Sequence, residues 1–553
     1  MLGKIQKFMR YRPATLALSA LCAFGVVSGC AVVLGFEETT RRTDDGEGGT
    51  TEGGPDGDAN LPPDSGPSRL TTKPASPVVR RGATADVVVE IARGSDVTGT
   101  VTAVLSDLPV GVTATTAMLA PTASTATLKL TAAANATLGL KTIKLTAEGS
   151  ALPAADIPLL VADPPGALDI TFDADGFVAD NTRGNGSTFF AVAVQTDQRI
   201  IAAGTAGPVG GPLAGWMVRR YTATGAPDAA FNTASAVGIP ADGELRAIAF
   251  DATGRIVCAG SSGNNPQLTV IRLSSTGAID KTFGAPTGIV RIANEGGAGA
   301  TAVGLGITVQ ADGKVIVVGE RRPLVGAETG TITRFNDNGV RDPGFNNGTT
   351  VAVPGTRFVG ASADVGGVFV GGSTIGGAPS YVVTRRTAAG AIDPTFGAAG
   401  TAVFGATFRA GGFARLMDGS FALVGDIQAG PEGYSAGVAD AMGVAAFART
   451  YGNAAGASFF GVALQADNRI VVAGHTAVAN GEARVERLLP GGDPDTSFGT
   501  GGIATIENTV PNALEVTLFG AAVQTDGRIL VAGNRSGAGA AAAPGATIYR
   551  LFP

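Results

Sequence analysis

The sequence predicts an all-β chain in which a small immunoglobulin-like β-sandwich precedes a seven-bladed β-propeller of four-stranded blades. Three observations support this fold class: turn residues are frequent, apolar residues come in short runs, and one pattern recurs seven times. The 553 residues include 83 glycines and 30 prolines, so long helices are not expected. With a net charge of −6 and 16% charged residues, the chain does not favour phosphate binding, and we expect no nucleic-acid partner.

Residues 1–29 have the layout of an export signal. Four basic residues between positions 4 and 12 precede the apolar stretch 14–27, which is too short for a good membrane span. The stretch is followed by the letters SGC, whose cysteine is Cys30. This ending resembles the bacterial lipobox, and the resemblance implies cleavage before Cys30 and lipid attachment to its sulfur. An ordinary signal peptide and an N-terminal anchor helix are the alternatives.

Residues 30–68 are predicted to be the lipid anchor and a disordered linker. Ala31 rather than Asp follows Cys30, so the usual inner-membrane retention signal is not visible. We therefore expect a lipid-anchored envelope protein at the outer membrane, with the membrane as a partner through the lipid. From residue 37 onward the segment is rich in Gly, Asp, Glu, Thr and Pro, and it has too few apolar residues to fold. A flexible tether is expected, with calcium binding by its acidic cluster as the alternative.

Residues 69–163 have a different pattern. Runs such as 86–91, 125–130 and 141–146 are typical of short strands, and turns that contain Pro and Gly separate them. A domain of this length that consists of short strands predicts an immunoglobulin-like β-sandwich.

The remaining residues, 164–553, contain seven copies of one pattern, and this repeat decides the predicted architecture. In its first part an apolar strand leads into a tight turn, often Asp-Gly followed by Lys or Arg, and a Val/Ile-rich strand leads out to a glycine. Consecutive glycines of this kind lie between 49 and 59 residues apart. They are Gly204, Gly260, Gly319, Gly371, Gly425, Gly474 and Gly533.

The second part of the pattern is an Asp that is followed three residues later by an aromatic residue. It occurs as Asp169/Phe172, Asp228/Phe231, Asp280/Phe283, Asp342/Phe345, Asp393/Phe396 and Asp495/Phe498. In the unit around residues 434–451 the Asp position is taken to be Ala448 and the aromatic position Tyr451. Because this motif separates a third strand from a fourth, each unit has the four strands of a propeller blade.

The D-G-[KR]-[IV] turn, the strand glycine and the D-x-[ST]-F-G motif together resemble the delta-60 repeat family of bacterial propeller-like proteins. The resemblance covers roughly residues 166–553, and the unit around residues 434–451 departs from it. It implies a propeller fold, and it brings no catalytic or ligand residues that could be assigned to positions in this chain.

Few residues suggest chemistry. His475 is the single histidine, which excludes a His-based metal cluster, and no nucleophile motif lies nearby. Trp216 is the single tryptophan, so the recurring aromatic box of propeller sialidases is missing. Cys258 lies in an apolar run and is expected to be a buried hydrophobic residue. Residues 336–339, Asn-Asp-Asn-Gly, resemble part of a calcium loop but are explained equally well as a turn. We predict no metal site, no cofactor and no catalytic residue.

In five units an Arg lies eight residues before the Asp and eleven before the aromatic residue. These pairs are Arg220/Asp228, Arg272/Asp280, Arg334/Asp342, Arg385/Asp393 and Arg487/Asp495. In the departing unit both positions change together, to Asp440 and Ala448. The joint loss predicts that the two side chains interact, because a lone buried member would be costly. Alternatively, each residue serves its own turn or a solvated face.

The two ends of the repeat region complement each other. Arg550 lies in the last strand with no Asp motif after it, whereas Asp169 has Val161 where the Arg would stand. We predict that residues 168–180 supply the fourth strand of the last blade and that Arg550 pairs with Asp169. Closure of this kind leaves no free strand edge in the ring.

These patterns favour a non-enzymatic envelope protein that displays a propeller for binding or structural interaction, with an unknown protein or glycan as its partner. The alternative is an envelope hydrolase or lyase, acting on polysaccharides, with its site at the propeller channel mouth. Such chemistry needs two carboxylates at a defined distance in space, and the sequence alone does not exclude such a pair. Most Asp residues, however, lie at repeated positions, which indicates a structural role.

Overall fold

The computed structural model describes residues 68–150, 152–180, 186–207, 215–231, 243–263, 265–292, 297, 299–428, 433–451, 457–476, 482–506, 515–536 and 545–553. The all-β prediction is confirmed: these residues form strands, with two short helical turns at Gly284–Gly288 and Asn346–Gly348. The export signal and Cys30 lie outside the described residues. None of the helical segments within the described ranges is long and apolar enough to cross a bilayer.

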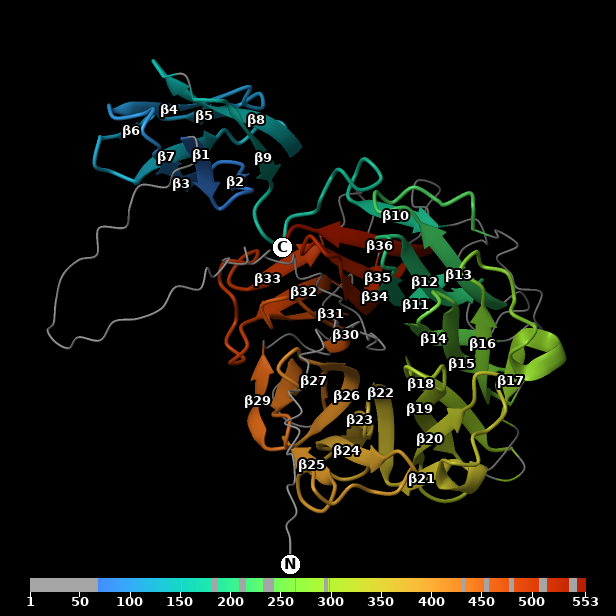
Figure 1. Ribbon diagram of the computed structural model, residues 1–553. Coiled ribbons are helices and arrows are strands. Elements are labelled where there is room, and N and C mark those ends of the chain that lie inside the picture. Colours follow the sequence, from blue (N-terminus) through green and yellow to red (C-terminus); the bar gives the residue numbers. More distant parts are fainter. Residues whose placement is uncertain are drawn as a thin grey trace, which may run out of the picture.

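The strands between residues 69 and 162 form two sheets that pack on each other (Figure 1). One sheet contains, in spatial order, β1 (Arg69–Lys73), β3 (Thr84–Ala92), β7 (Thr125–Ala132) and β5 (Val112–Ala114). The other contains β2 (Val78–Arg80), β9 (Ala155–Ala162), β8 (Gly139–Glu148), β4 (Val101–Ser106) and β6 (Ala117–Leu119). Alternate residues such as Val87, Leu128 and Leu145 share one core between the sheets, as the period of two in a strand requires.

Seven further sheets follow, and they are numbered here in chain order. Sheet 1 contains β11 (Thr188–Val194), β12 (Ile200–Ala206) and β13 (Gly215–Tyr221). Sheet 2 contains β14 (Gly243–Phe250), β15 (Ile256–Ser262), β16 (Gln267–Leu273) and β17 (Ile289–Arg291). Sheet 3 contains β18 (Thr301–Val309), β19 (Val315–Arg322), β20 (Thr329–Phe335) and β21 (Val351–Pro354). Sheet 4 contains β22 (Thr356–Asp364), β23 (Gly367–Thr374), β24 (Tyr381–Thr387) and β25 (Thr401–Phe404).

The last three sheets have the same order of strands. Sheet 5 contains β26 (Phe408–Arg415), β27 (Phe421–Ile427), β28 (Tyr434–Ala439) and β29 (Ala445–Tyr451). Sheet 6 contains β30 (Ser458–Leu464), β31 (Ile470–His475), β32 (Ala483–Leu488) and β33 (Ile503–Ile506). Sheet 7 contains β34 (Glu515–Val523), β35 (Ile529–Ser536), β36 (Gly545–Leu551) and β10 (Phe177–Asp180). Sheet 1 has three described strands, and residues 232–242, which precede β14, lie outside the described ranges.

The seven sheets surround a central axis, with the first strand of each sheet innermost (Figure 1). Each inner strand contacts the inner strands of two neighbouring sheets, and β34 of sheet 7 contacts β11 of sheet 1, so the ring closes. Hydrophobic side chains fill the space between neighbouring sheets. The seam between sheets 7 and 1 has the same construction, with Phe172, Val178 and Leu530 buried in one cluster.

Sheet 7 is completed by the segment that precedes sheet 1. Strand β10 runs antiparallel to β36, with Phe177 opposite Tyr549. The Thr547 hydroxyl donates a hydrogen bond of 3.0 Å to the backbone oxygen of Val178. Strands from the two ends of the repeat region therefore share one sheet.

The ring has two distinct faces. The Asp-containing turn that joins the first two strands of each sheet lies on one face, which we call the turn face. In five of the seven sheets the residue after the Asp adopts a positive φ, for example 82° at Gly313 and 67° at Gln198, which explains the preference for Gly there. We call the opposite face, where the inner strands begin, the mouth face.

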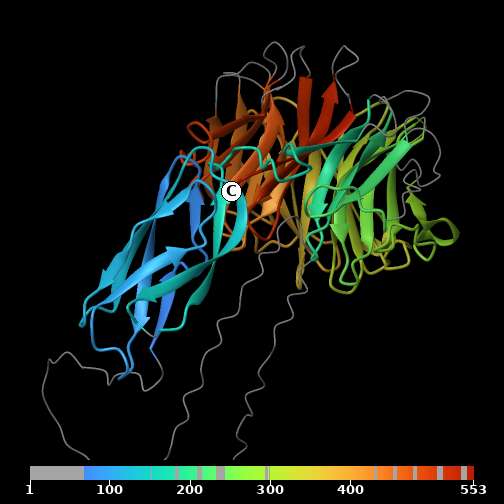
Figure 2. The same cartoon turned by 90° about the horizontal axis from the view of Figure 1, so that it is seen from above.

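The sandwich is joined to the ring at the turn face. The backbone N–H of Gly499, in the connection after β32, donates to Pro165 in the segment that leaves the sandwich, at 2.8 Å. Arg80 of β2 donates to the backbone oxygen of Pro553 at 2.9 Å. Figure 2 shows the sandwich extending obliquely from the ring. The segment between the two parts is thus held against sheets 6 and 7.

Candidate functional site

Six Arg–Asp pairs join the third strand of a sheet to the connection that follows it. Their side-chain N–O distances are 2.8 Å for Arg220–Asp228, Arg272–Asp280, Arg334–Asp342 and Arg487–Asp495, 3.3 Å for Arg385–Asp393, and 2.9 Å for Arg550–Asp169. In five of the six, the guanidinium also lies over the phenylalanine that follows the Asp, 4.6–4.9 Å from the ring centroid. Arg, Asp and Phe therefore form one contact unit on the turn face.

Sequence reasoning missed a second basic residue in four of these units. The Arg at the end of the turn between the first two strands contacts the same carboxylate. The distances are 2.9 Å for Arg199–Asp228, 3.7 Å for Arg255–Asp280, 2.8 Å for Arg469–Asp495 and 2.7 Å for Arg528–Asp169. The basic residue of the D-G-[KR] pattern was the available signal for this contact. The sequence shows that this residue recurs but does not show which carboxylate its side chain approaches.

Four of these carboxylates, those of Asp228, Asp280, Asp393 and Asp495, have a pKa below the ordinary value of an aspartate. Burial alone would raise the pKa of Asp280, but hydrogen bonds from Thr282 and the charge of Arg272 outweigh it, so the pKa lies below its ordinary value. The pKa of Asp495 is lowered by the same balance of effects. A carboxylate that stays ionised near neutral pH suits an ion pair better than it suits proton transfer.

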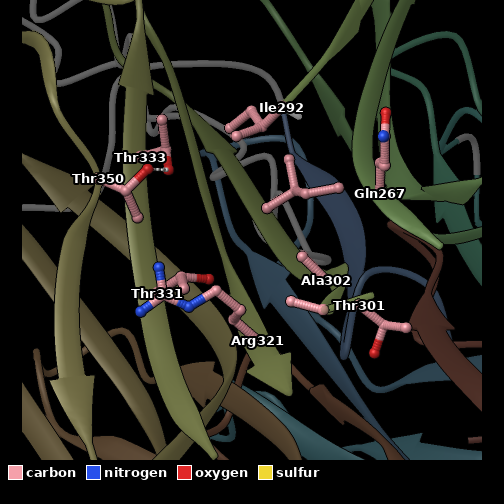
Figure 3. Close-up of a pocket in the computed structure, with 10 residues that line it drawn as sticks. Gln267, Ile292, Thr301, Ala302, Arg321, Thr331, Thr333 and Thr350 are labelled. Atoms are coloured by element: carbon pink, nitrogen blue, oxygen red, sulfur yellow. Dashed lines mark hydrogen bonds between the residues drawn. The ribbon is translucent and has the colours of Figure 1, made fainter. Parts of the chain in front are cut away.

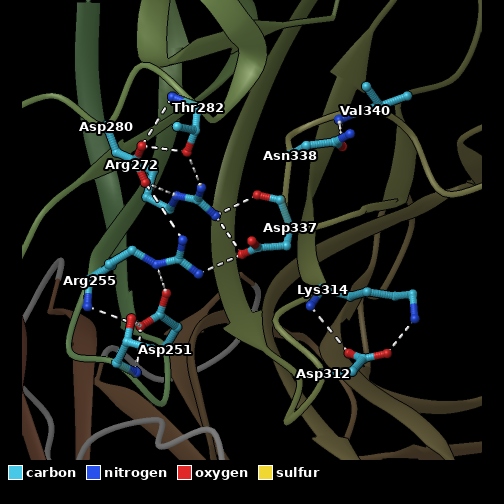
Figure 4. Close-up of polar contacts among 11 residues, drawn as sticks. Asp251, Arg255, Arg272, Asp280, Thr282, Asp312, Lys314, Asp337, Asn338 and Val340 are labelled. Carbon is cyan, nitrogen blue, oxygen red and sulfur yellow. Dashed lines mark hydrogen bonds and ion pairs between the residues drawn. The ribbon is translucent and has the colours of Figure 1, made fainter.

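The same arginines reach the next sheet (Figure 4). Arg272 Nη1 donates to the backbone oxygen of Asp337 at 2.5 Å, and Asp337 Oδ1 lies 2.6 Å from nitrogen atoms of both Arg255 and Arg272. Arg550 crosses the closing seam in the same way, to a backbone oxygen in the connection after β13, at 2.5 Å. The calcium-like stretch 336–339 therefore has its carboxylate engaged by two guanidinium groups.

Sheet 5 departs from the other sheets, and its alignment from sequence is wrong. Residues 440–444 join β28 directly to β29, so Ala448 lies within a strand rather than in a connection. The recurrent aromatic position is filled by Phe447, not Tyr451. A Cβ on Gly492 of sheet 6 would lie 2.7 Å from the Phe447 ring, the close approach that the recurrent phenylalanines make to glycines elsewhere. The shortened connection leaves no place for an Arg–Asp pair.

Near the mouth face, every inner strand has a β-bulge at the same level. The residues left out of the strand pairing are Phe190, Arg246, Leu305, Val359, Gly411, Phe460 and Phe519. All seven line an axial cavity of about 150 Å³. Because a bulge redirects a side chain, each sheet presents one residue to the axis at this level.

The residue after each bulge is small. It is Ala in sheets 1 and 2 and Gly in the other five. A Cβ on Gly306 would lie 2.6 Å from the Cα of Gly360, so these positions let neighbouring inner strands approach closely. The bulges were not predicted, and this repeated small residue is the signal that could have found them.

The bulged side chains differ from sheet to sheet although the backbone repeats. One side of the cavity has a continuous series of contacts, called here the stack, in which Phe519 and Phe190 meet edge to face; its members are His475, Phe460, Phe519, Phe190 and Arg246. The ring centroids are 6.1 Å apart for His475–Phe460, 5.4 Å for Phe460–Phe519 and 5.0 Å for Phe519–Phe190. The Arg246 guanidinium lies 3.9 Å from the Phe190 centroid. His475 is the last residue of β31 and belongs to this stack.

Arg246 is the one charged side chain among the described residues that line the cavity. Its Nη2 lies 2.7 Å from Glu244 Oε2, and its Nε has no hydrogen-bond partner among the described residues. Burial lowers the pKa of Arg357, Glu320 opposes this shift, and the charges of Arg409 and Arg246 add to it. The charges of Arg409 and Arg246 therefore act on Arg357, which forms an ion pair with Glu320 at 2.9 Å.

Two carboxylates in sheets 5 and 6 have a pKa raised by burial, Asp426 and Glu486. The Tyr434 hydroxyl donates to Glu486 Oε2 at 2.6 Å, and the backbone N–H of Phe459 donates to Asp426 Oδ1 at 3.3 Å. Neither carboxylate lines the axial cavity, whose described lining contains no Asp or Glu. Glycoside hydrolysis usually needs two carboxyl groups that flank the substrate, and the described lining of this cavity offers neither.

A second cavity, of about 20 Å³, lies between sheets 2 and 3 (Figure 3). Thr331, Thr333 and Thr350 border it, and the hydroxyl oxygens of the last two are 3.0 Å apart. A space of this size suits a water molecule and is too small for an organic ligand.

Cys258 is fully buried in β15, and burial raises the pKa of its thiol to about 12. A thiol in such surroundings is inert. Within the ranges that the structure covers, no three His, Cys, Asp or Glu side chains gather as metal ligands.

Three segments of the chain match the sequence family described as "Domain of unknown function (DUF5122) beta-propeller": residues 252–283, 310–345 and 465–498. Each segment runs from the turn between the first two strands to the aromatic residue of the Arg–Asp–Phe unit. Together with the sheets described above, the match shows a β-propeller-like repeat protein. No curated protein matches the whole sequence significantly.

Solved structures show only distant similarity. Domains 5–6 of the S-layer protein SbsC are 14% identical, with 40% of this chain and 94% of that chain covered at a TM-score of 0.14. Native E. coli alpha-2-macroglobulin is 9% identical, with 86% of this chain and 31% of that chain covered at a TM-score of 0.18. TM-scores of this size do not indicate a shared fold, so the architecture rests on the strand pairing and packing.

Proposed function

We propose that the chain is an exported cell-envelope lipoprotein that displays a seven-bladed β-propeller as a non-enzymatic binding module. Residues 1–29 are then removed, Cys30 carries the lipid, and residues 30–68 form the tether. An immunoglobulin-like domain spans residues 69–163, and the propeller spans residues 164–553. The outer membrane is one partner, through the lipid, and a protein or glycan bound at the mouth face is the other.

The placement of the two faces carries this proposal. The sandwich, and with it the tether side of the chain, joins the ring at the turn face, where Gly499 donates to Pro165. The axial cavity opens near the opposite face. A module held in this way presents its mouth to the surroundings, and the varied bulge side chains on a repeated backbone fit recognition.

The six Arg–Asp pairs have a different role in this proposal. They recur with the repeat, they are held by internal partners, and they lie on the turn face. We assign them to holding the connections between strands, with Arg550 and Asp169 holding the closing seam.

Replacing Cys30 with Ser tests the anchor. We expect the variant to lose incorporation of labelled palmitate and to leave the membrane fraction or accumulate unprocessed, because the lipobox sulfur is the acceptor. Unchanged labelling and membrane fractionation would show that Cys30 is not the anchor.

A biosensor measurement tests the binding face. Lipid-free envelope extract is immobilised, and detergent-solubilised full-length protein is passed over it. We expect an Arg246→Ala/Phe519→Ala double variant to lose binding, and Lys314→Ala, on the turn face, to keep it. Equal retention of both variants would overturn the assignment of the mouth as the binding face.

A further inference from the structure

We propose that the axial cavity binds one six-membered ring that carries a carboxylate, namely a uronic acid residue at the end of an envelope glycan. This inference rests on the proposed function and names the ligand class of the same site. Size, ring-stacking surface and charge each support it.

The size of the cavity fits one ring. Its volume is about 150 Å³, and an engineered cavity of about this volume holds a single benzene molecule. The cavity is therefore too small for a folded partner or a stretch of polypeptide. One terminal sugar residue fits, with the rest of the glycan leaving through the mouth.

The lining offers both surfaces that a sugar ring needs. Phe460, Phe519 and Phe190 present a continuous aromatic wall, and the first two are half-buried, so part of each ring faces the cavity. Aromatic faces pack against apolar surface, such as the C–H face of a pyranose. The bulged residues lie outside the regular strand pairing, and we expect their peptide groups to form hydrogen bonds with the hydroxyl groups of the sugar. A lining of aromatic faces and a few polar groups is typical of small-ligand sites.

The charge at the cavity selects an acid. Arg246 is about one-third exposed, Glu244 contacts its Nη2, and Nε has no partner among the described residues. A guanidinium recognises a carboxylate well through its N–H groups. Arg246 is the one charged side chain among the described lining residues, and the nearby Arg357 is paired with Glu320 at 2.9 Å.

Calorimetric titration of the detergent-solubilised full-length protein tests the inference with three probes: D-glucuronate, D-glucose and benzoate. We expect glucuronate to bind about tenfold more tightly than glucose and than benzoate. Arg246→Gln should abolish the preference for glucuronate over glucose. Phe519→Leu should weaken both sugars, because it removes the central ring of the stack. Arg449→Gln, the same change on the outer strand of sheet 5, should leave all three affinities unchanged.

Several results would overturn the inference. Equal binding of glucose and glucuronate rejects the charge selection, and binding of benzoate alone rejects a sugar. Absence of binding by all three probes rejects the ligand class. The biosensor test of the mouth variants is independent of these probes, so failure of the ligand class and failure of the binding face can be told apart.

Discussion

Sheets 5 and 6 join their third and fourth strands in two different ways. In sheet 6 the connection spans residues 489–502 and carries Asp495, which Arg487 contacts at 2.8 Å. In sheet 5 residues 440–444 make the join alone, and no such pair is present there. Phe447 of sheet 5 still packs against a glycine of sheet 6, as the phenylalanines of the longer connections pack against their own neighbours.

The difference separates two roles that the repeat normally combines. In sheet 5 the aromatic contact with the neighbouring sheet is retained although the ion pair is absent. We infer that the aromatic contact stabilises the packing between sheets, whereas the ion pair stabilises the long connection. The seam between sheets 5 and 6 has other polar and aromatic contacts instead. The Tyr434 hydroxyl donates a hydrogen bond of 2.6 Å to Glu486 Oε2. The rings of Tyr434 and Tyr451 are stacked, with their centroids 5.0 Å apart.

The largest effect is expected where an ion pair also closes the ring. Asp169 is fully buried between Arg550 and Arg528, at 2.9 and 2.7 Å. Asp169→Ala leaves the buried Arg550 without its counter-charge and leaves Arg528 with Asp526 alone, so we expect a loss of about 3–5 kcal/mol in the free energy of unfolding. Urea unfolding of the full chain measures it. Asp493→Ala, at an exposed carboxylate, is the control, and an equal effect of both would contradict a special role for the seam.

The aromatic contacts of the two sheets can be compared directly. Phe498 is fully buried, and Phe498→Ala should cost about 3–5 kcal/mol. Phe447 is half-buried, and Phe447→Ala should cost about 1–2 kcal/mol, because less apolar surface is lost. Both values come from urea midpoints. If Phe447→Ala had no effect, the aromatic contact would not be the retained feature of sheet 5.

The ion pairs give the long connections a pH dependence. The pKa of Asp495 is lowered in the folded chain, whereas an unfolded Asp titrates near about 3.9. The stabilisation is therefore fully present above that unfolded value and is lost as the pH falls through the lower folded pKa. Asp495→Asn should destabilise the chain clearly at about pH 7 and much less at about pH 2, in unfolding measured across that range. A destabilisation independent of pH would contradict the charge interaction.

The smallest effect is expected at the exposed pair of sheet 5. Arg449 lies 2.5 Å from Asp493, and both side chains are exposed, by 45% and 70%. Arg449→Ala should change the free energy of unfolding by about 0.2–1 kcal/mol, and the difference should shrink in high salt. A change as large as that of Asp169→Ala would mean that exposure does not decide the value of these pairs.

The regular parts of the repeat could be read from the sequence because they depend on chain spacing. In the five units with a full-length connection, the Arg and the Asp are eight residues apart. Because the connection has the same length in each of these units, the same two side chains come into contact. The same assumption misplaced sheet 5. A constant spacing assigned Tyr451 to the aromatic position, whereas the connection there is shorter and Phe447 occupies it.

The axial cavity could not be read in the same way. A β-bulge depends on how two strands pair. The sequence of one strand does not indicate which of its residues will be left unpaired. The stack of Phe190, Phe460 and Phe519 also joins residues from three sheets far apart in the chain. The Gly or Ala after each bulge marks the position, but the side chain that matters stands before it and varies.

The shared sheet of β10 and β36 sets the order in which the chain can fold. Val178 and Thr547 are 369 residues apart, so a ribosome has to make the last repeat before the first segment finds its place. Until then the edge strand of sheet 7 is exposed and can pair with the wrong strand. The pairing of β10 with β36 must also overcome the entropy cost of closing a very long loop. This sheet is therefore completed only after the last repeat has been synthesised.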